Sequence, residues 1–97
     1  MSEHRVTRRN VEAMAEDCRL LAGELGLCNP GEVWVIEPGS TTYGNKWKLY
    51  AEVAGTRYKL PFTGDLDFIG NTARQARDFL EHIWEALFYV QMMLEAR

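Results

Sequence analysis

The C-terminal stretch that begins at Thr72 constrains the fold most strongly, because it has the pattern of one long helix. Thr72 followed by Gln75 is a capping-box pair, in which the threonine oxygen accepts from a free backbone N–H and the glutamine reaches back. The apolar residues then recur at intervals of three and four, which places them on one helical stripe: Ala73, Ala76, Leu80, Ile83, Leu87, Val90 and Leu94. We therefore expect a helix over residues 72–97.

The second half of this helix is apolar on nearly every side, and such a helix is normally covered on every side. At 1.5 Å per residue the helix would be about 39 Å long, whereas the longest predicted strand would reach about 30 Å. About two turns should then extend beyond the sheet. We predict that they contact a second protein chain, most simply another copy in a homodimer. The expected interface residues are Trp84, Phe88, Tyr89, Met92 and Met93. The alternatives are that the N-terminal helix covers these residues alone, or that the last turn frays.

A second amphipathic helix is predicted over residues 7–25, after a mobile tail at residues 1–6. Its apolar stripe has the same spacing and consists of Val11, Met14, Cys18, Leu21 and Leu25. Gly26 suits the left-handed backbone position that follows many helices, and Leu27 can fold back on Leu21 to seal the turn.

Strands are predicted between the two helices. Glu32–Glu37 is rich in β-branched and aromatic residues. Because this segment does not alternate, either Val33 and Val35 or Trp34 and Ile36 face outward. A loop is expected over residues 38–45.

A hairpin follows. Lys46–Ala54 alternates between apolar and polar residues, as a half-buried strand does. Gly55-Thr56 suits a type II′ turn, which predicts a register with these opposite pairs: Val53 and Tyr58, Ala51 and Leu60, Glu52 and Lys59. The segment from Phe62 to Gly70 is expected to connect the sheet to the last helix.

The order of helix, three strands and helix predicts an α+β fold. A three-stranded antiparallel sheet has one core face, and two amphipathic helices supply its cover. We therefore expect a two-layer sandwich with both helices on one face of the sheet. A chain of 97 residues, 46% of them hydrophobic, is sufficient for one domain, which would span residues 1–97.

Composition also bears on the compartment and on partners. No apolar run approaches the length of a membrane span, and the N-terminus lacks an apolar signal core, so a cytoplasmic protein is expected. Two cysteines, Cys18 and Cys28, are too few and wrongly spaced for a metal motif. We interpret both as reduced thiols and expect Cys18 in the core. The alternative is a disulfide between them. The net charge of −3 disfavours general attraction to nucleic acid.

Candidate catalytic and metal-binding residues are sparse. His82 lies one helical turn from Asp78 and close to Glu85, which is a permitted metal geometry but a common surface arrangement. Asp65 and Asp67 lack the rest of a calcium loop. No nucleophile is paired with a histidine, because neither His82 nor His4 has a buried partner. We therefore predict no catalytic residues, no cofactor and no metal site, and a protein that is not an enzyme.

A basic surface gives the alternative function, which is binding to nucleic acid. One face of the predicted hairpin carries basic side chains and an aromatic ring that can follow a phosphate backbone: Lys46, Lys48, Tyr50, Arg57 and Lys59. Glu52 lies among them. The competing interpretation is the ordinary solvated face of a sheet, where charges prevent aggregation.

The order of elements resembles that of the double-stranded-RNA-binding domain over residues 8–96. In that family a lysine cluster similar to Lys-Lys-x-Ala-Lys opens the second helix. The matching stretch here is Ala73-Arg74-Gln75-Ala76-Arg77, in which Arg74 and Arg77 fit the pattern and Ala73 departs from it. The resemblance implies contact with double-stranded RNA through Arg74 and Arg77, together with the hairpin face.

Two short stretches carry a second resemblance. Residues 43–47 (Tyr-Gly-Asn-x-Trp) and residues 72–80 are similar to small uncharacterised proteins of actinobacterial phages. The resemblance implies an accessory protein that binds a host or phage partner. The expected function is therefore a non-enzymatic protein-interaction module.

Overall fold

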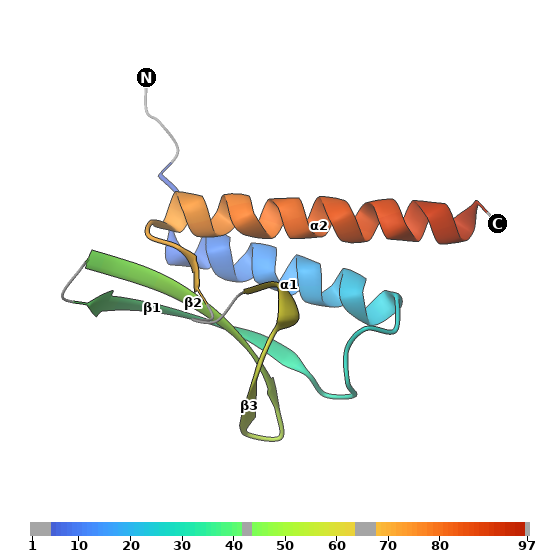
Figure 1. Cartoon of the computed structure of the whole chain (residues 1–97), viewed down its shortest axis with the longest axis horizontal. Coiled ribbons are helices and arrows are strands. Elements are labelled where there is room, and N and C mark those ends of the chain that lie inside the picture. Colours follow the sequence, from blue (N-terminus) through green and yellow to red (C-terminus); the bar gives the residue numbers. More distant parts are fainter. Residues whose placement is uncertain (1–4, 42–43, 64–67, 97) are drawn as a thin grey trace.

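The computed structural model describes residues 5–41, 44–63 and 68–96, and these form an α+β fold as predicted (Figure 1). The elements in chain order are α1 (Arg8–Glu24), β1 (Val33–Thr41), β2 (Gly44–Val53), β3 (Thr56–Lys59), a short 3-10 helix η1 (Pro61–Thr63), β4 (Phe68–Gly70) and α2 (Ala73–Glu95).

The sheet is antiparallel and is built around β2. Along nearly its full length β2 pairs with β1, from Thr41 opposite Gly44 to Val33 opposite Glu52. Its other edge pairs with β3 near the hairpin turn and with β4 farther along. Two short strands, β3 and β4, therefore lie end to end along the same edge of β2. β4 was not predicted, because only three residues of the expected connecting segment pair with β2.

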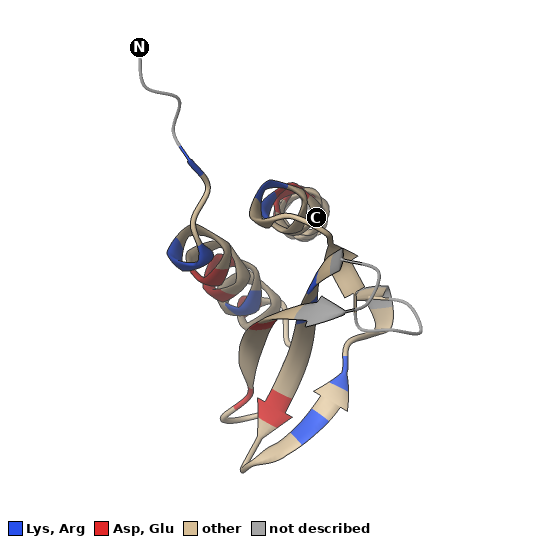
Figure 2. Cartoon of the chain, turned by 90° about the vertical axis from the view of Figure 1, so that its left-hand side faces the viewer, with Lys and Arg blue, Asp and Glu red and all other residues tan. Residues whose placement is uncertain are grey.

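Both helices cover one face of this sheet, which gives the predicted two layers (Figures 1 and 2). The core lies between the helices and the sheet and consists of Val11, Ala15, Cys18, Ile36, Leu49, Ala51, Leu60, Ile69, Ala76 and Leu80. Of the two alternatives for β1, Trp34 and Ile36 face the core, whereas Val33 is 45% exposed. Val6 is half-buried against the core, and residues 1–4 lie outside the described part of the chain.

Small residues let α1 approach its neighbours closely. Ala15 and Ala22 are buried together with Val11, Cys18 and Leu21, while the larger Met14 is only half-buried. Gly26 adopts the expected left-handed conformation with φ of 75°. Leu27, however, is 65% exposed and does not bury its side chain against the helix as expected. Backbone hydrogen bonds close the turn, with the N–H of Leu27 donating to the carbonyl oxygen of Ala22 and that of Gly26 to the carbonyl oxygen of Gly23.

The expected loop at residues 38–45 was wrong, because β1 continues to Thr41 and β2 begins at Gly44. Pro38 lies within β1, opposite Trp47 of β2. An edge strand tolerates proline, since only one side of it needs to donate to the sheet, and β1 is an edge strand.

The predicted register of the second hairpin was also wrong, by two residues. Ala51 lies opposite Tyr58 and Val53 opposite Thr56, so the two turn residues are Ala54 and Gly55. Both have positive φ, 50° and 83°, as a type I′ turn requires. A shift of two residues leaves every side chain on its original face, so the apolar pattern could not distinguish the two registers.

This turn gives a stability test. Alanine in the left-handed region costs about 1–2 kcal/mol, and asparagine followed by glycine is the preferred type I′ pair. We expect Ala54→Asn to raise the free energy of unfolding by about 1 kcal/mol, measured by urea denaturation. A destabilised Ala54→Asn variant would contradict this turn, because Ala54 would then be an ordinary strand residue.

The junction between β4 and α2 is tightly packed. A Cβ atom on Gly70 would lie 2.7 Å from the backbone nitrogen of Ala76 and 2.9 Å from Cβ of Gln75. As predicted, Thr72 caps α2, and its hydroxyl oxygen accepts from the N–H of Gln75 at 3.1 Å. The Gln75 side chain reaches back one residue farther than expected and accepts from the N–H of Asn71 at 2.8 Å. The start of α2 is therefore held against the sheet.

We expect Gly70→Ala to lower the free energy of unfolding by about 1–3 kcal/mol, because the added methyl group overpacks the junction. Gly23→Ala is the matched control, since its Cβ would meet nothing within 4 Å and alanine favours a helix by about 1 kcal/mol. Thermal unfolding of both variants should show shifts of opposite sign. A tolerated Gly70→Ala would show that the junction is loosely packed.

Candidate functional site

The predicted stripe of α2 loses its cover toward the C-terminus. Ala76 and Leu80 are fully buried, Ile83 and Leu87 are half-buried, and Val90 and Leu94 are 43% and 49% exposed. Figure 1 shows the cause, because α2 extends beyond the end of α1 and the β2–β3 turn points away from both helices. The expectation that the last turns extend beyond their cover is confirmed. Whether another chain contacts them stays a prediction.

The five residues predicted as an interface lie on two sides of α2. Trp84 and Phe88 turn toward α1 and line the space between the helices. Successive residues of a helix are rotated by about 100°, so Tyr89 and Met93 lie on the other side, and Met92 lies beyond Phe88 on the α1 side. Tyr89, Met92 and Met93 are each more than half exposed.

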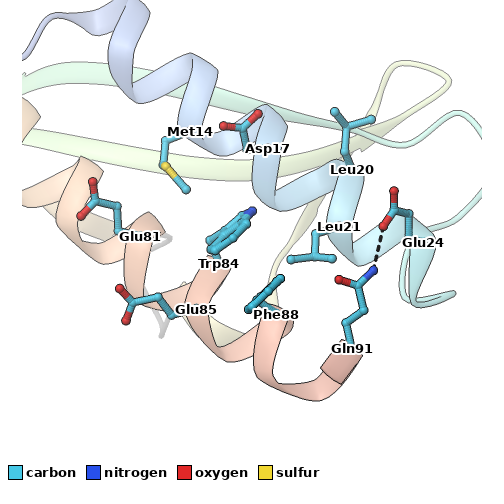
Figure 3. Close-up of a pocket in the computed structure, with 10 residues that line it drawn as sticks. All are labelled: Met14, Asp17, Leu20, Leu21, Glu24, Glu81, Trp84, Glu85, Phe88 and Gln91. Atoms are coloured by element: carbon cyan, nitrogen blue, oxygen red, sulfur yellow. Dashed lines mark hydrogen bonds between the residues drawn. The ribbon is translucent and has the colours of Figure 1, made fainter. Parts of the chain in front are cut away.

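We call the space between the helices the interhelical groove; it has a volume of about 670 Å³ (Figure 3). The rings of Trp84 and Phe88 stack in it with centroids 5.0 Å apart and an interplanar angle of 9°. At one end, Nε2 of Gln91 donates to Oε2 of Glu24 at 3.0 Å. The lining residues are Met14, Asp17, Leu20, Leu21 and Glu24 from α1, and Glu81, Trp84, Glu85, Phe88 and Gln91 from α2.

A second space lies on the other side of α2, and we call it the apolar cavity. Its volume is about 350 Å³. All of its lining residues except one are apolar: Ala22, Leu27, Glu32, Trp34, Leu60, Pro61, Ile83, Ala86, Leu87 and Val90. Protein interiors are normally packed without such gaps, so the apolar cavity is an incomplete extension of the core.

Glu32 is the polar residue of the apolar cavity and is only 7% exposed. Nε1 of Trp34 donates to its Oε2 at 2.8 Å, and the backbone N–H and side-chain amide of Asn29 donate to its Oε1 at 3.2 and 3.3 Å. Burial raises the pKa of Glu32, but these hydrogen bonds lower it by more, so the pKa lies below its usual value. Glu32 therefore fixes the turn before β1 and orients Trp34. Sequence reasoning missed this role, because nothing in the pattern marked Glu32 as buried.

Both cysteines are free thiols, and Cys18 is buried as predicted. Burial, with a smaller contribution from Asp17, raises the pKa of Cys18 to about 12, and its Sγ donates to the carbonyl oxygen of Leu80 at 3.1 Å. Burial likewise raises the pKa of Cys28 to about 11. Reactive cysteines have lowered pKa values, so neither thiol has the properties of a nucleophile.

The basic residues of the hairpin lie on the outer face of the sheet, where acidic residues neutralise part of their charge. Nη1 of Arg57 lies 2.7 Å from Oε2 of Glu37, its Nε lies 3.9 Å from Oε1 of Glu52, and its guanidinium covers the ring of Tyr50 at 5.1 Å. Lys48 lies opposite Glu37 and Lys59 lies opposite Tyr50 in the sheet. Nζ of Lys46 lies 6.0 Å from the centroid of the Phe68 ring.

The remaining basic candidates are not on this surface. Arg74 and Arg77 belong to α2, which packs on the opposite face of the sheet (Figure 2). Arg77 is in addition close to carboxylates, with Nη2 3.4 Å from Asp78 and Nε 3.5 Å from Glu81. The structure therefore divides the predicted nucleic-acid residues between two sides of the molecule.

Among the described residues, no group of three or more histidine, cysteine and acidic side chains is placed to hold a metal ion. His82 is exposed on α2, and the other metal candidates, Asp65 and Asp67, lie outside the described residues, as does His4. Within the same ranges, neither helix combines the length and the apolar character that crossing a membrane requires.

Comparison with known proteins returns no matching family model, no matching curated protein and no matching solved structure.

The Glu32 network predicts a pH dependence of stability. Because the pKa of Glu32 is lowered in the folded state, its contribution is present above the unfolded pKa of about 4.3 and is lost as the pH falls through the folded pKa. We expect Glu32→Gln to lower the free energy of unfolding by about 1–3 kcal/mol at pH 7, because an amide cannot accept both sets of hydrogen bonds. The difference should shrink at pH 3, measured by urea denaturation. A constant difference at both pH values would rule out this role, and the exposed Glu12→Gln is the control.

Proposed function

We propose that this protein is a non-enzymatic protein-interaction module that forms a homodimer through the C-terminal half of α2. The observation that carries the proposal is the row of exposed apolar side chains on that half, from Phe88 to Leu94. Large exposed apolar surfaces rimmed by polar residues mark contact sites on soluble domains. An accessory protein with a host or phage partner, as the short resemblances imply, would use the same kind of surface.

The side of α2 that borders the apolar cavity is the best suited to a second copy. We call it the outer stripe, and it consists of Ala86, Tyr89, Val90 and Met93. The spacing of three and four places these residues on one side, and none of them is charged. Ala86 is small, so the backbone of a second helix can approach there. Two copies of α2 can pair antiparallel about a two-fold axis, which is the commonest symmetry of homodimers.

The outer stripe is too small to be the whole interface. A stable interface buries about 800 Å² from each partner, and even an aromatic side chain supplies at most about 250 Å². The contact should therefore include the mouth of the apolar cavity, where Leu27 is 65% exposed. A side chain of the second copy would fill that cavity and complete the packing of Val90 and Leu87.

Binding to nucleic acid is the alternative, and the observed charges favour it less. Arg57 is engaged by Glu37 and Glu52, and the arginines of α2 lie on the other side of the molecule. Affinity for nucleic acid depends on the number of phosphates that basic groups neutralise. A gel shift at two salt concentrations would test this function directly.

The homodimer is tested by two neighbouring substitutions. We expect Met93→Glu to weaken dimerisation at least about tenfold, because it places an unpaired carboxylate in the apolar contact. Met92→Glu is the matched control, since Met92 and Met93 are 53% and 54% exposed and point to different sides of α2. Sedimentation equilibrium over a range of concentrations measures both variants.

A wild-type protein that remains monomeric at millimolar concentration would reject the homodimer. Equal weakening by Met92→Glu and Met93→Glu would reject the outer stripe as its location. The circular dichroism spectra of both variants should match that of the wild type, because neither methionine belongs to the core.

A further inference from the structure

The floor of the interhelical groove consists of apolar and aromatic side chains, which can contact apolar and planar groups of a partner. The stacked rings of Trp84 and Phe88 lie between the two helices (Figure 3). Leu20, which is 51% exposed, also lines the groove. Met14 and Leu21 complete the floor. Such a surface binds leucine-like side chains by burial and accepts cations over the indole face.

The charged side chains that line this groove are all acidic, and the neutral Gln91 lies at one end. Asp17 and Glu24 come from α1, and Glu81 and Glu85 come from α2. All four are exposed, and none of the ten lining residues is basic. The outer stripe, in contrast, carries no charge, so the two sides of α2 differ in chemistry.

We propose that the interhelical groove binds a basic amphipathic helix of a partner protein, rich in arginine and leucine. Its leucine face would contact the floor of the groove, and its arginines would pair with the acidic rim. Arginine suits the site better than lysine, because guanidinium stacks on aromatic rings and pairs with carboxylates through two hydrogen bonds. The groove volume of about 670 Å³ accommodates several side chains.

A second copy of this chain does not present a basic amphipathic helix that could bind in the groove. The basic residues on the outer face of the sheet belong to strands and alternate with Glu37 and Glu52. The remaining described basic residues lie just before or on turns of α1 and α2 whose apolar residues are already buried in the core: Arg5, Arg8, Arg9, Arg19, Arg74 and Arg77. The groove therefore serves a different protein, and it lies on the side of α2 away from the outer stripe, so the proposal does not depend on the homodimer.

The probe for the test is a fluorescein-labelled synthetic peptide of about 16 residues, long enough to form a helix on binding, with leucine on one face and arginine on the other. The comparison peptide has glutamate in place of every arginine. Fluorescence anisotropy with the full-length protein should show saturable binding of the arginine peptide that weakens as salt increases. The glutamate peptide should not bind.

Charge reversals locate the site. The double variant Glu81→Lys/Glu85→Lys should weaken peptide binding at least about tenfold. The control is Glu12→Lys/Glu95→Lys, which changes the net charge equally at two acids outside the groove. The two variants are closely matched, because Glu81 and Glu12 each lie 3.5 Å from an arginine one helical turn earlier. The control should weaken binding less than about threefold.

Phe88→Ala tests the floor, since it removes the ring stacked on Trp84 and should also weaken binding while the fold, followed by circular dichroism, is retained. Met93→Glu should bind the peptide as the wild type does, so a failed homodimer and a failed groove can be told apart.

Equal weakening by both double variants would overturn the proposal in favour of general charge attraction. Binding of both peptides, or of neither at millimolar concentration, would also overturn it. Self-association that Phe88→Ala abolishes and Met93→Glu does not would show instead that a second copy occupies the groove.

Discussion

The close contact between β4 and α2 determines where the rest of α2 must lie. Gly70 leaves no room for a side chain against Gln75 and Ala76, and the cap at Thr72 starts the helix at that point. A helix that starts there and continues to Glu95 passes the end of α1. The exposure of its last turns therefore follows from where its first turn is held.

The same helix presents two chemically different sides. Toward α1 it contributes two carboxylates and two stacked rings, and toward the apolar cavity it contributes uncharged residues around Ala86. Neither side is fully covered, because α1 ends before α2 does and the β2–β3 turn points away from both helices. The two contacts that we propose, one with a second copy of the chain and one with a basic helix, would therefore use different sides of α2.

Much of the fold could be predicted, because apolar periodicity reports which face of an element is buried. The predicted stripes were confirmed in part, since Val11, Cys18 and Leu21 are buried in α1 but only Ala76 and Leu80 in α2. The cap at Thr72 and the left-handed Gly26 were also confirmed. The turn at Ala54 was wrong, because a register shift of two residues preserves every face. Strand β4 was missed, because a three-residue strand is recognised only by its pairing with β2.

The amino-acid sequence by itself determined the α+β class, the faces of the helices and the apolar character of the last turns of α2, because these depend on spacing within one element. Only the tertiary structure decided which side of α2 each residue occupies relative to its neighbours. It also brought Asp17 and Glu24 of α1 across from Glu81 and Glu85 of α2. These relations join residues far apart in the chain, and no local periodicity encodes the distance or the angle between two packed elements.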